Sequence, residues 1–557
     1  MNSLPIEKLQ NKPIIYAFCI NAAFALAFLL FFYNNYETND DQLMLMLLTG
    51  AFSGTGTHYI MYVNSILSFP LQLLYAAIPS IHWYPIFQYI VVLVSFTAIT
   101  YVFIKKDLNR GLIVSILLLC SFGFDFYTQM QFTKVSGCAT AAGILLGLHS
   151  FFISESRIPK LIPASILVVI GSLFRFNMSL VAIFFSSSLI IFLSYMFIKD
   201  KRYKELIFPA MWLLALFSIC FILSIANDTI YQKDEKWSAY MDFNVSRSQL
   251  LDRSFPNYAD NKDLYLSMDI SQDDINLYRT WDFGDPDLFS PENVKRMATA
   301  RISPNINIDF VKSFFSSVLL EYFDYPWILG FLIACVLILY VSRKNIIWLL
   351  IQIGLLSTFS FYLFYYERYL KNRVDICIFL ASTLVLLFIY METQERGTTI
   401  NHKHLILALS LIMLIHFPTY TRYIKDYDNA ALLSEEHRST ANIIANDDSH
   451  LYLVSLMSSD IWRDSYSIFE PIKPGTMSNV CFLGGCFAFT PEWDRMLERW
   501  DISNPYIDCI NNESIYILDN KHINSIVAYI NRHYDPNAKA LPVNVVDGCA
   551  IYQIVSE

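Results

Sequence analysis

The sequence predicts an all-α polytopic membrane protein with about eleven transmembrane helices, an interfacial helix and a small extracytoplasmic α/β C-terminal domain. Composition, recurring apolar runs and the distribution of Lys and Arg support this fold class. Of the 557 residues, 55% are hydrophobic and only 16% are charged, with a mean hydropathy of +0.40. A soluble protein of this composition would expose apolar surface to water and aggregate. We therefore expect an integral protein of the plasma or inner membrane.

Apolar runs long enough to cross a hydrocarbon core of about 30 Å recur along most of the chain. The first, residues 13–33, is long for a secretory signal and no small-residue cleavage site follows it, so we expect a retained anchor. The run 59–78 contains Asn64, Pro70 and Gln72, and counting it as a crossing would disrupt the charge pattern, so we expect an interfacial helix. The expected crossings are 13–33, 85–104, 111–127, 137–153, 160–174, 177–198, 205–225, 326–342, 346–365, 375–391 and 403–420.

The positive charges assign the two sides of the membrane. With eleven crossings, the N-terminus is cytoplasmic, and five cytoplasmic connections hold thirteen Lys and Arg, as the positive-inside rule requires. These connections are 105–110, 153–160, 199–204, 343–345 and 393–404. The outer connection 365–375 is an exception, because it carries several cations. An anionic ligand explains cations placed against the insertion bias better than topology does.

The same topology divides the chain into four parts and places two large polar segments outside. The strand-like runs LYLVSL, SIYIL, LPVNVV and CAIYQIV, with helical stretches PEWDRMLERW and HINSIVAYINRHY between them, predict the small α/β domain. The parts are an N-terminal transmembrane module at 1–225 with an outer first loop at 34–84, a large extracytoplasmic loop at 226–325, further transmembrane helices at 326–420, and the extracytoplasmic α/β domain at 421–557.

Cysteine usage agrees with an outward terminal domain. Cys481, Cys486, Cys509 and Cys549 fall in this domain, and an even number suggests two disulfides, with buried free thiols as the alternative. Their spacing is not that of a zinc site.

Side chains that could accept a proton or bind an anion lie at the outer ends of different spans. Asp40 and Asp41 follow the first span, where water contact would keep a carboxylate ionised and able to accept a proton. Cations suit a phosphate, and the planar fork of Arg grips two of its oxygens. The candidate phosphate ligands are Lys134, Arg175, Arg368, Lys371 and Arg373.

The outer loops add candidates for contact with an acceptor. These are His58 in the first loop and Arg247, Asp252 and Trp281 in the large loop. The large loop also contains an acidic run, which either binds a divalent cation or keeps an exposed loop soluble, and we favour solubility. The acidic run comprises Asp273, Asp274, Asp282, Asp285 and Asp287.

The layout resembles the GT-C superfamily of integral membrane glycosyltransferases, which use polyprenyl-phosphate donors. The resemblance spans nearly the whole chain: a first span, an outward acidic pair, an interfacial helix, many further spans and an outward terminal domain. The stretches QFTKVSG, LFRFN, WSAYMDFNVSRSQLLDRSFPNY and SQDDINLYRTWDFGDPDLF also resemble bacterial multi-span surface-polysaccharide proteins. In that superfamily the first outer loop carries the catalytic base, which implies this role for Asp40 or Asp41. No WWD-type sequence occurs, which disfavours peptide acceptors recognised in that way.

The resemblance implies transfer of a sugar from a polyprenyl phosphate to an extracytoplasmic glycan or glycolipid. The expected partners are the lipid-linked sugar, the acceptor and the bilayer, without nucleic acid, and no cofactor beyond the possible divalent cation is indicated. A polysaccharide polymerase or ligase acting on lipid-linked chains remains an alternative, since it would share the outward cations. A non-catalytic glycan transporter or scaffold is less favoured, because ionisable residues are scarce in mid-span.

Each candidate also has a structural interpretation. Asp40 and Asp41 would stabilise a helix N-terminus, where negative charge is favourable. Arg175 and Lys134 could extend from the membrane to the interface. Arg368, Lys371 and Arg373 have Glu367 and Asp375 as nearby ion-pair partners, and His58 could be a polar residue at the rim of the interfacial helix.

Overall fold

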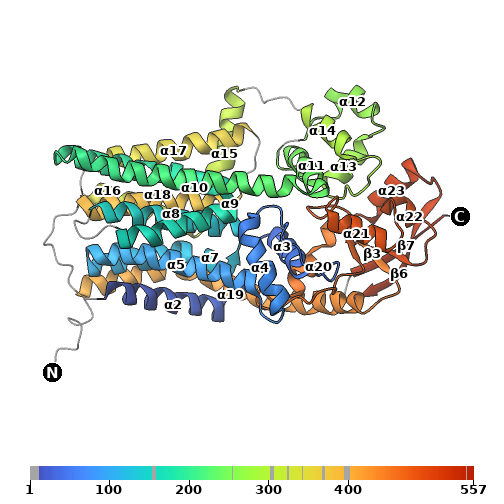
Figure 1. Ribbon diagram of the computed structural model, residues 1–557, viewed down its shortest axis with the longest axis horizontal. Helices are drawn as coiled ribbons and strands as arrows, with labels where there is room; N and C mark the ends of the chain where they lie inside the picture. The colour runs from blue at the N-terminus through green and yellow to red at the C-terminus, as the bar shows by residue number, and fades with distance from the viewer. Residues whose placement is uncertain are drawn as a thin grey trace.

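The computed structural model is elongated, with a helical bundle at one end and an extramembrane region at the other (Figure 1). Helix α2 (Pro13–Phe31) lies in the bundle, and strand β7 (Cys549–Ser556) lies toward the opposite end of the long axis (Figure 1). The structure describes residues 12–152, 158–253, 255–300, 306–322, 325–341, 343–366, 371–393, 402–546 and 549–556.

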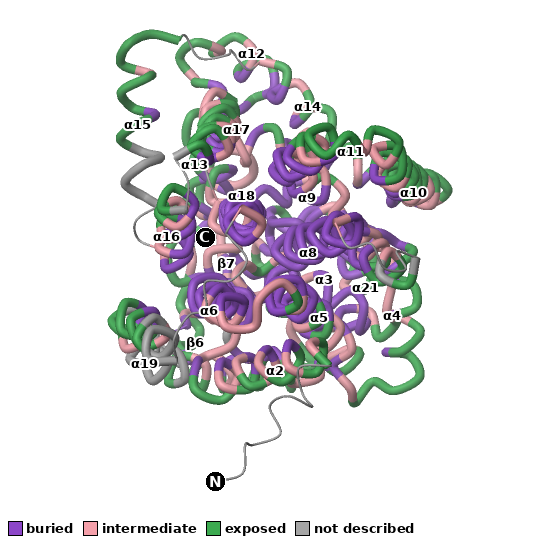
Figure 2. The backbone as a smooth tube through the Cα atoms, turned by 90° about the vertical axis from the view of Figure 1, so that its left-hand side faces the viewer, coloured by how far each residue is buried: buried purple, intermediate pink, exposed green. Residues whose placement is uncertain are grey.

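Eight helical segments of the described chain are long and apolar enough to cross a membrane, which confirms a polytopic membrane protein. The central helices α8 and α18 are 94% buried in their most apolar windows, whereas α2 and α10, at the periphery of the bundle, are 22% and 17% buried (Figure 2). The eight segments are α2 (Pro13–Phe31), α5 (Trp83–Lys106), α6 to α7 (Leu108–Thr128), α8 (Phe132–Phe152), α9 (Ile158–Lys199), α10 (Ile207–Gln232, preceded by a 3-10 turn), α17 (Ile346–Tyr365) and α18 (Asn372–Thr393).

Helix α9 contains two of the expected crossings, because the chain reverses at Arg175. This residue has φ −163° and ψ 101°, outside the helical region. Ala164 packs against Gly143 of α8, and the ring of Phe192 lies 6.3 Å from that of Phe152. In a straight helix Ala164 and Phe192 would be about 42 Å apart, whereas Gly143 and Phe152 span about 14 Å. The two halves of α9 therefore run in opposite directions along α8.

Three shorter apolar helices complete the bundle region. The expected interfacial helix is α4 (Ser65–Ala77), whose 13 residues extend about 20 Å and are too short to cross the hydrocarbon core. The expected crossings 326–342 and 403–420 correspond to α16 (Trp327–Val341) and to the first part of α19 (His402–Ala445). Helix α19 continues out of the bundle to the extramembrane region, so the expected domain boundary at 421 falls inside it (Figure 1). The count of eleven crossings stays a prediction.

Three connections assigned to the cytoplasm meet at one end of the bundle. Lys106 forms an ion pair with Glu392, and its Nζ lies 3.8 Å from the ring centroid of Phe388. Asn345 donates a hydrogen bond of 2.9 Å to the Thr393 hydroxyl. The sheet lies at the other end (Figure 1). The shared sidedness of these connections agrees with the charge pattern that was used to count the spans.

The terminal α/β domain is confirmed. Its mixed five-stranded sheet has the order β4-β3-β5-β7-β6, with β3 parallel to β4 and β5, and β7 antiparallel to β5 and β6. Strand β4 was not predicted, since its three residues are too few to show a pattern. The strands are β3 (Leu451–Val454), β4 (Val480–Phe482), β5 (Ile515–Leu518), β6 (Ala538–Val546) and β7 (Cys549–Ser556), and the helices are α20 (Asp460–Ser465), α21 (Pro491–Arg499), α22 (Pro505–Asp508) and α23 (Ile523–His533).

The large loop folds into short helices, and three buried acids join one part of it to this domain. Asp274 accepts a hydrogen bond of 2.6 Å from Arg532, Asp282 accepts one of 2.9 Å from Ser455, and Asp285 accepts one of 2.6 Å from Tyr529. All three acids have 0% exposure. The expectation that the acidic run keeps an exposed loop soluble is therefore wrong for these three acids, whereas Asp273 and Asp287 are exposed. The loop helices are α11 (Glu235–Leu251), α12 (Lys262–Leu266), α13 (Gln272–Arg279), α14 (Pro291–Thr299) and α15 (Ile308–Tyr322).

The expectation of two disulfides in the terminal domain is also wrong. Cys481, Cys486, Cys509 and Cys549 are all free and buried. Their neighbours explain why they do not meet: the Cys486 thiol faces the Tyr62 hydroxyl at 3.0 Å, whereas the Cys549 thiol accepts from the Asn520 amide at 3.5 Å. Each thiol fills a separate part of the interior, where it behaves as a small apolar group.

The opposite locations of Lys199 and Lys521, both exposed, provide a test of orientation. We expect a membrane-impermeant thiol reagent to label Lys521→Cys in intact cells and Lys199→Cys only after permeabilisation, because the positive-inside rule places α9's end in the cytoplasm. Labelling would be measured by a mass-tag shift on gels, with the wild type giving the background from native cysteines. The reverse pattern would invert the assigned topology.

Candidate functional site

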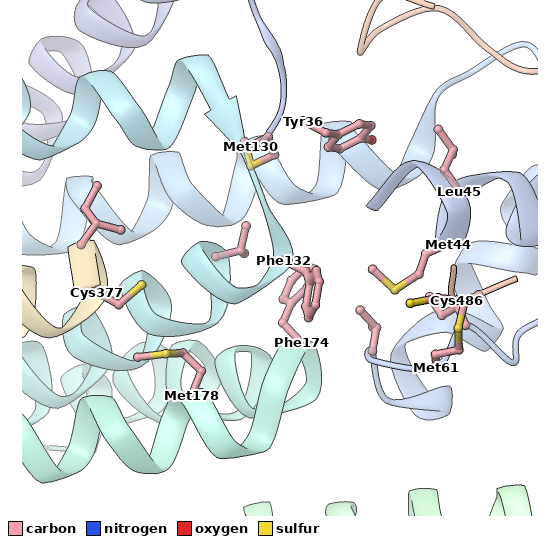
Figure 3. Close-up of a cluster of buried hydrophobic side chains, with 14 of the residues drawn as sticks. Tyr36, Met44, Leu45, Met61, Met130, Phe132, Phe174, Met178, Cys377 and Cys486 are labelled. Carbon is pink, nitrogen blue, oxygen red and sulfur yellow. The ribbon is translucent and has the colours of Figure 1, made fainter. Parts of the chain in front are cut away.

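A cavity of about 420 Å³ lies where the membrane helices meet the extramembrane region. Its walls come from the first loop and α3 (Asn39–Thr49), the ends of α8 and α18, the break in α9, the large loop and the terminal domain. Figure 3 shows Phe132 and Phe174 between the ends of the membrane helices and the side chains of Met44, Met61 and Cys486 from the extramembrane segments. The cavity thus lies between elements that are far apart in the sequence.

Asp40 lies in the first turn of α3 and lines the cavity. Its Oδ2 is 3.9 Å from Nη2 of Arg373, and its Oδ1 is 3.8 Å from the thiol of Cys486. The side chain is 20% exposed. A carboxylate in a first turn also interacts favourably with the helix dipole, so the structural interpretation and a reactive role are compatible. Asp40 combines cavity access with a neighbouring cation.

Asp41 points in another direction and does not line this cavity. Its carboxylate accepts hydrogen bonds of 2.8 Å from the Tyr84 hydroxyl, 2.8 Å from the Gln88 amide and 3.2 Å from the Phe132 backbone N–H. Burial raises the pKa of Asp41 to about 7, although these three donors favour the charged form. Asp41 therefore attaches the first turn of α3 to the ends of α5 and α8.

Arg175 lines the cavity from the reversal of α9. Its guanidinium donates a hydrogen bond of 2.7 Å to the Thr133 hydroxyl and lies 5.2 Å from the ring centroid of Phe132. The break frees the Arg175 carbonyl from the helical ladder, and the Ser136 hydroxyl donates to it at 2.9 Å. Residues at the N-terminal end of α8 therefore hold both the backbone and the side chain of Arg175.

The N-terminal end of α18 provides two more of the expected cations. Lys371 lies 3.4 Å from Asp252 of the large loop, and Arg373 approaches Asp40. Arg368 lies outside the described residues. The contacts of Lys371 and Arg373 connect the start of α18 with the large loop and the first loop. An ion pair with Asp375 would instead have stayed within α18.

Lys134 and His58 do not line the described cavity. Lys134 is buried, forms ion pairs with Asp125 and with Glu37 (2.6 Å), and donates to the Gln129 carbonyl at 3.0 Å. The His58 ring packs on the rings of its neighbours in the first loop. The phosphate contact expected for Lys134 and the acceptor contact expected for His58 stay predictions, and Lys134 acts structurally by holding the first loop on the bundle.

The large loop provides Arg247, Asp252 and Trp281 to the same cavity. The Arg247 guanidinium lies 4.9 Å from the ring centroid of Trp281. It also donates to Asn244 at 2.6 Å and to the Tyr62 hydroxyl at 3.4 Å. The three loop candidates, 34 residues apart at most in the sequence, thus line the same cavity as the helix-end cations.

Trp281 has φ +71°, an uncommon conformation for a bulky residue. The Gly485 N–H donates to its carbonyl at 3.0 Å, and a Cβ at Gly484 would lie 1.6 Å from that carbonyl oxygen. The consecutive glycines 484 and 485 therefore permit the close approach that fixes Trp281 beside Arg247.

The terminal domain supplies cavity residues that the sequence analysis did not select. Trp462, Asp460 and Arg463 come from α20, and Gln42 of α3 donates to the Trp462 carbonyl. Arg463 and Asp460 form an ion pair of 2.9 Å. The Gly-Gly pair at 484–485 is the signal that could have indicated this approach of the terminal domain.

The described cavity lining contains five cationic side chains and four carboxylates, so it favours a bound anion. The described residues contain no group of three or more His, Cys, Asp or Glu that could hold a metal ion. The cations are Arg175, Arg247, Lys371, Arg373 and Arg463, and the carboxylates are Glu37, Asp40, Asp252 and Asp460.

Fold and site together define an integral membrane protein with a cationic cavity between its membrane helices and its extramembrane region. No family model matches this chain, and no curated protein matches it. Among solved structures, the chain is similar to ArnT from Cupriavidus metallidurans bound to undecaprenyl phosphate, with a TM-score of 0.42 and 9% identity over 97% of both chains. For ArnT from Cupriavidus metallidurans in the apo state, the TM-score is 0.43 and the identity is 8%, again over 97% of both chains. Since both TM-scores are below 0.5, the function is inferred from this chain's own residues.

The close approach at Gly484 gives a test of how the loop docks. We expect Gly484→Ala to lower the thermal midpoint by several degrees, because its methyl group would collide with the Trp281 carbonyl. Differential scanning fluorimetry of the purified protein would measure this shift. Gly354→Ala is the matched control, since no atom lies within 4 Å of its Cβ position. Equal midpoints for the two variants would contradict this docking.

The raised pKa of Asp41 gives a test of its burial. Because the folded state holds the proton more tightly than the unfolded state, the stabilisation is complete below about pH 4 and is lost as pH rises through about 7. Between pH 5.5 and 8 the loss amounts to about 2 kcal/mol. We expect the midpoint of Asp41→Asn, relative to wild type, to rise by a few degrees over this interval. The exposed-site variant Asp263→Asn should show no such trend, and a pH-independent difference for Asp41→Asn would refute the burial argument.

Proposed function

We propose that this protein is a membrane glycosyltransferase that moves a sugar from a polyprenyl-phosphate donor to an extracytoplasmic glycan or glycolipid. The observation that carries the proposal is the single cavity that combines Asp40 with Arg175, Lys371 and Arg373. The polyprenyl chain would lie in the bilayer, and its phosphate would reach the cations at the ends of the membrane helices.

In the proposed reaction, Asp40 accepts the proton of the acceptor hydroxyl. The acceptor oxygen forms a bond with the anomeric carbon, and the bond between that carbon and the phosphate oxygen breaks. The electron pair of the broken bond leaves with the lipid phosphate, so charge develops on an oxygen that a guanidinium can stabilise. Access to the cavity supports Asp40 for this role over Asp41, whose carboxylate is occupied by Tyr84 and Gln88.

The helix-end cations are suited to the departing phosphate. Arg175 and Arg373 offer planar forks that match two phosphate oxygens, and Lys371 adds a compact charge. Arg373 also lies 3.9 Å from Asp40, so it would contact both the leaving group and the proposed base.

The aromatic lining supports a sugar as the transferred group. Trp281, Trp462, Tyr62 and Phe487 all border the cavity. Aromatic faces bind the apolar C–H surfaces of sugars, while their edges and the neighbouring polar groups orient the hydroxyls. The cations would bind the phosphate of a lipid-phosphate sugar, and the neighbouring aromatic side chains would bind its sugar.

Removing the proposed base tests this function. In a host strain that lacks this gene, we expect the wild type to restore a sugar on the surface glycan and Asp40→Asn to reduce its transfer by about 10²-fold or more, since the proton acceptor is lost. Arg175→Ala should also reduce transfer. Mass spectrometry of surface-glycan composition would measure the outcome, with protein amounts matched by immunoblot.

Asp263→Asn, which neutralises an exposed acid of the large loop, is the matched control and should restore the sugar fully. Restoration by Asp40→Asn at the wild-type level would exclude Asp40 as the base. A polymerase or ligase would instead alter the length distribution of the polysaccharide without changing its sugar composition, and the same samples would reveal this.

A further inference from the structure

Arg247 is a buried cation with an unused donor. Arg247 is only 2% exposed, yet its Nη1 has no hydrogen-bond partner among the described residues. The groups that do contact it, Asn244 and Tyr62, are neutral. In the described part of the chain no carboxylate forms an ion pair with it. The Asp252 carboxylate acts on its charge from a distance and forms its ion pair with Lys371 instead. Burying a guanidinium without an ion pair of its own is costly, so its retention at a cavity wall indicates an anionic ligand.

The site around Arg247 is built rigidly. The ring of Trp281 covers the guanidinium at 4.9 Å, held by the backbone contact with Gly485. The Nε and Nη2 groups of the guanidinium both donate hydrogen bonds to Oδ1 of Asn244, at 3.1 and 2.6 Å. These two bonds fix the plane of the guanidinium. With these two nitrogens held in place, Nη1 has a defined position for an anionic oxygen.

Arg247 is separate from Arg175, one of the helix-end cations. The ring of Tyr62 stacks on that of Phe132 at 5.6 Å, and Arg175 contacts the Phe132 ring. Because Arg247 contacts Tyr62, this aromatic stack connects the two arginines and keeps their guanidinium groups apart. Arg175 lies at the turn of a membrane helix, whereas Arg247 lies on α11 of the extramembrane loop.

Arg247 is nevertheless close to the proposed base. The Cys486 thiol lies 3.0 Å from the Tyr62 hydroxyl, which Arg247 contacts, and 3.8 Å from Asp40 Oδ1. An anionic group bound at Arg247 would therefore place a hydroxyl of the same molecule within reach of Asp40.

We propose that Arg247 forms a second anion subsite that binds a carboxylate or phosphate carried by the acceptor, distinct from the subsite for the donor phosphate. The acceptor is accordingly an acidic glycan or glycolipid rather than a neutral one. This inference rests on the proposed function, because that function defines which molecule is the acceptor.

Binding measurements on the purified full-length protein test the two subsites independently of turnover. The probes are undecaprenyl phosphate for the donor subsite, and glucuronate and glycerol 3-phosphate for the acceptor subsite, with glucose and glycerol as neutral counterparts. Affinities would be taken from ligand-dependent thermal shifts. We expect Arg247→Gln to lower the affinity for at least one acidic probe by about tenfold, because a charged hydrogen bond is lost. The affinity for undecaprenyl phosphate should stay unchanged.

Matched variants complete the test. Arg175→Gln should lower the affinity for undecaprenyl phosphate and leave the affinities for the acidic probes unchanged. The exposed-site control Arg279→Gln should change none of these affinities. If Arg247→Gln does not fold, Arg247→Lys serves in its place, because it keeps the charge but loses the fork and should weaken the acidic probes to a smaller extent.

Three results would overturn the inference. The wild type could bind neither acidic probe, or bind acidic and neutral probes equally, or Arg247→Gln could lose affinity for undecaprenyl phosphate, which would assign Arg247 to the donor. Failure of the proposed function has a different signature, since it would appear as full sugar transfer by Asp40→Asn whatever the binding data show.

Discussion

The buried carboxylate of Asp41 is the constraint on which the site depends. It accepts hydrogen bonds from Tyr84, Gln88 and the Phe132 backbone, and so fixes the first turn of α3 to the ends of two membrane helices. Asp40 is the preceding residue in the same turn, and it points into the cavity because Asp41 points out of it. A buried acid with three donors is well satisfied, so this turn has a defined position rather than a range of them.

The cavity itself is closed by contacts between distant segments. Lys134 joins the first loop to the bundle through Glu37 and Asp125, while Lys371 joins α18 to the large loop through Asp252. The Gly-Gly pair at 484–485 then lets the terminal domain approach Trp281. The site is therefore an interface of four parts of one chain, and the buried acids of the large loop stabilise that interface.

The distribution of charge gives the cavity two poles. Arg175, Lys371 and Arg373 lie at the ends of membrane helices, next to where lipid head groups would lie, whereas Arg247 lies on the extramembrane side. Asp40 lies between Arg373 and the group formed by Cys486, Tyr62 and Arg247. The proposed base between two proposed anion subsites would suit a reaction that joins a lipid-anchored molecule to a second molecule from outside.

The sequence by itself determined the membrane class, the terminal α/β domain and part of the set of acids and cations that meet in the cavity, because apolar length, strand patterns and charges at span ends are local properties. Only the tertiary structure separated Asp40 from Asp41, turned Lys134 into a buried structural cation and brought in Trp462 and the Gly-Gly pair. Adjacent helical residues point in different directions, and a buried lysine and an interfacial lysine look the same in sequence. Their roles depend on which distant segments pack against them, and no local pattern records that packing.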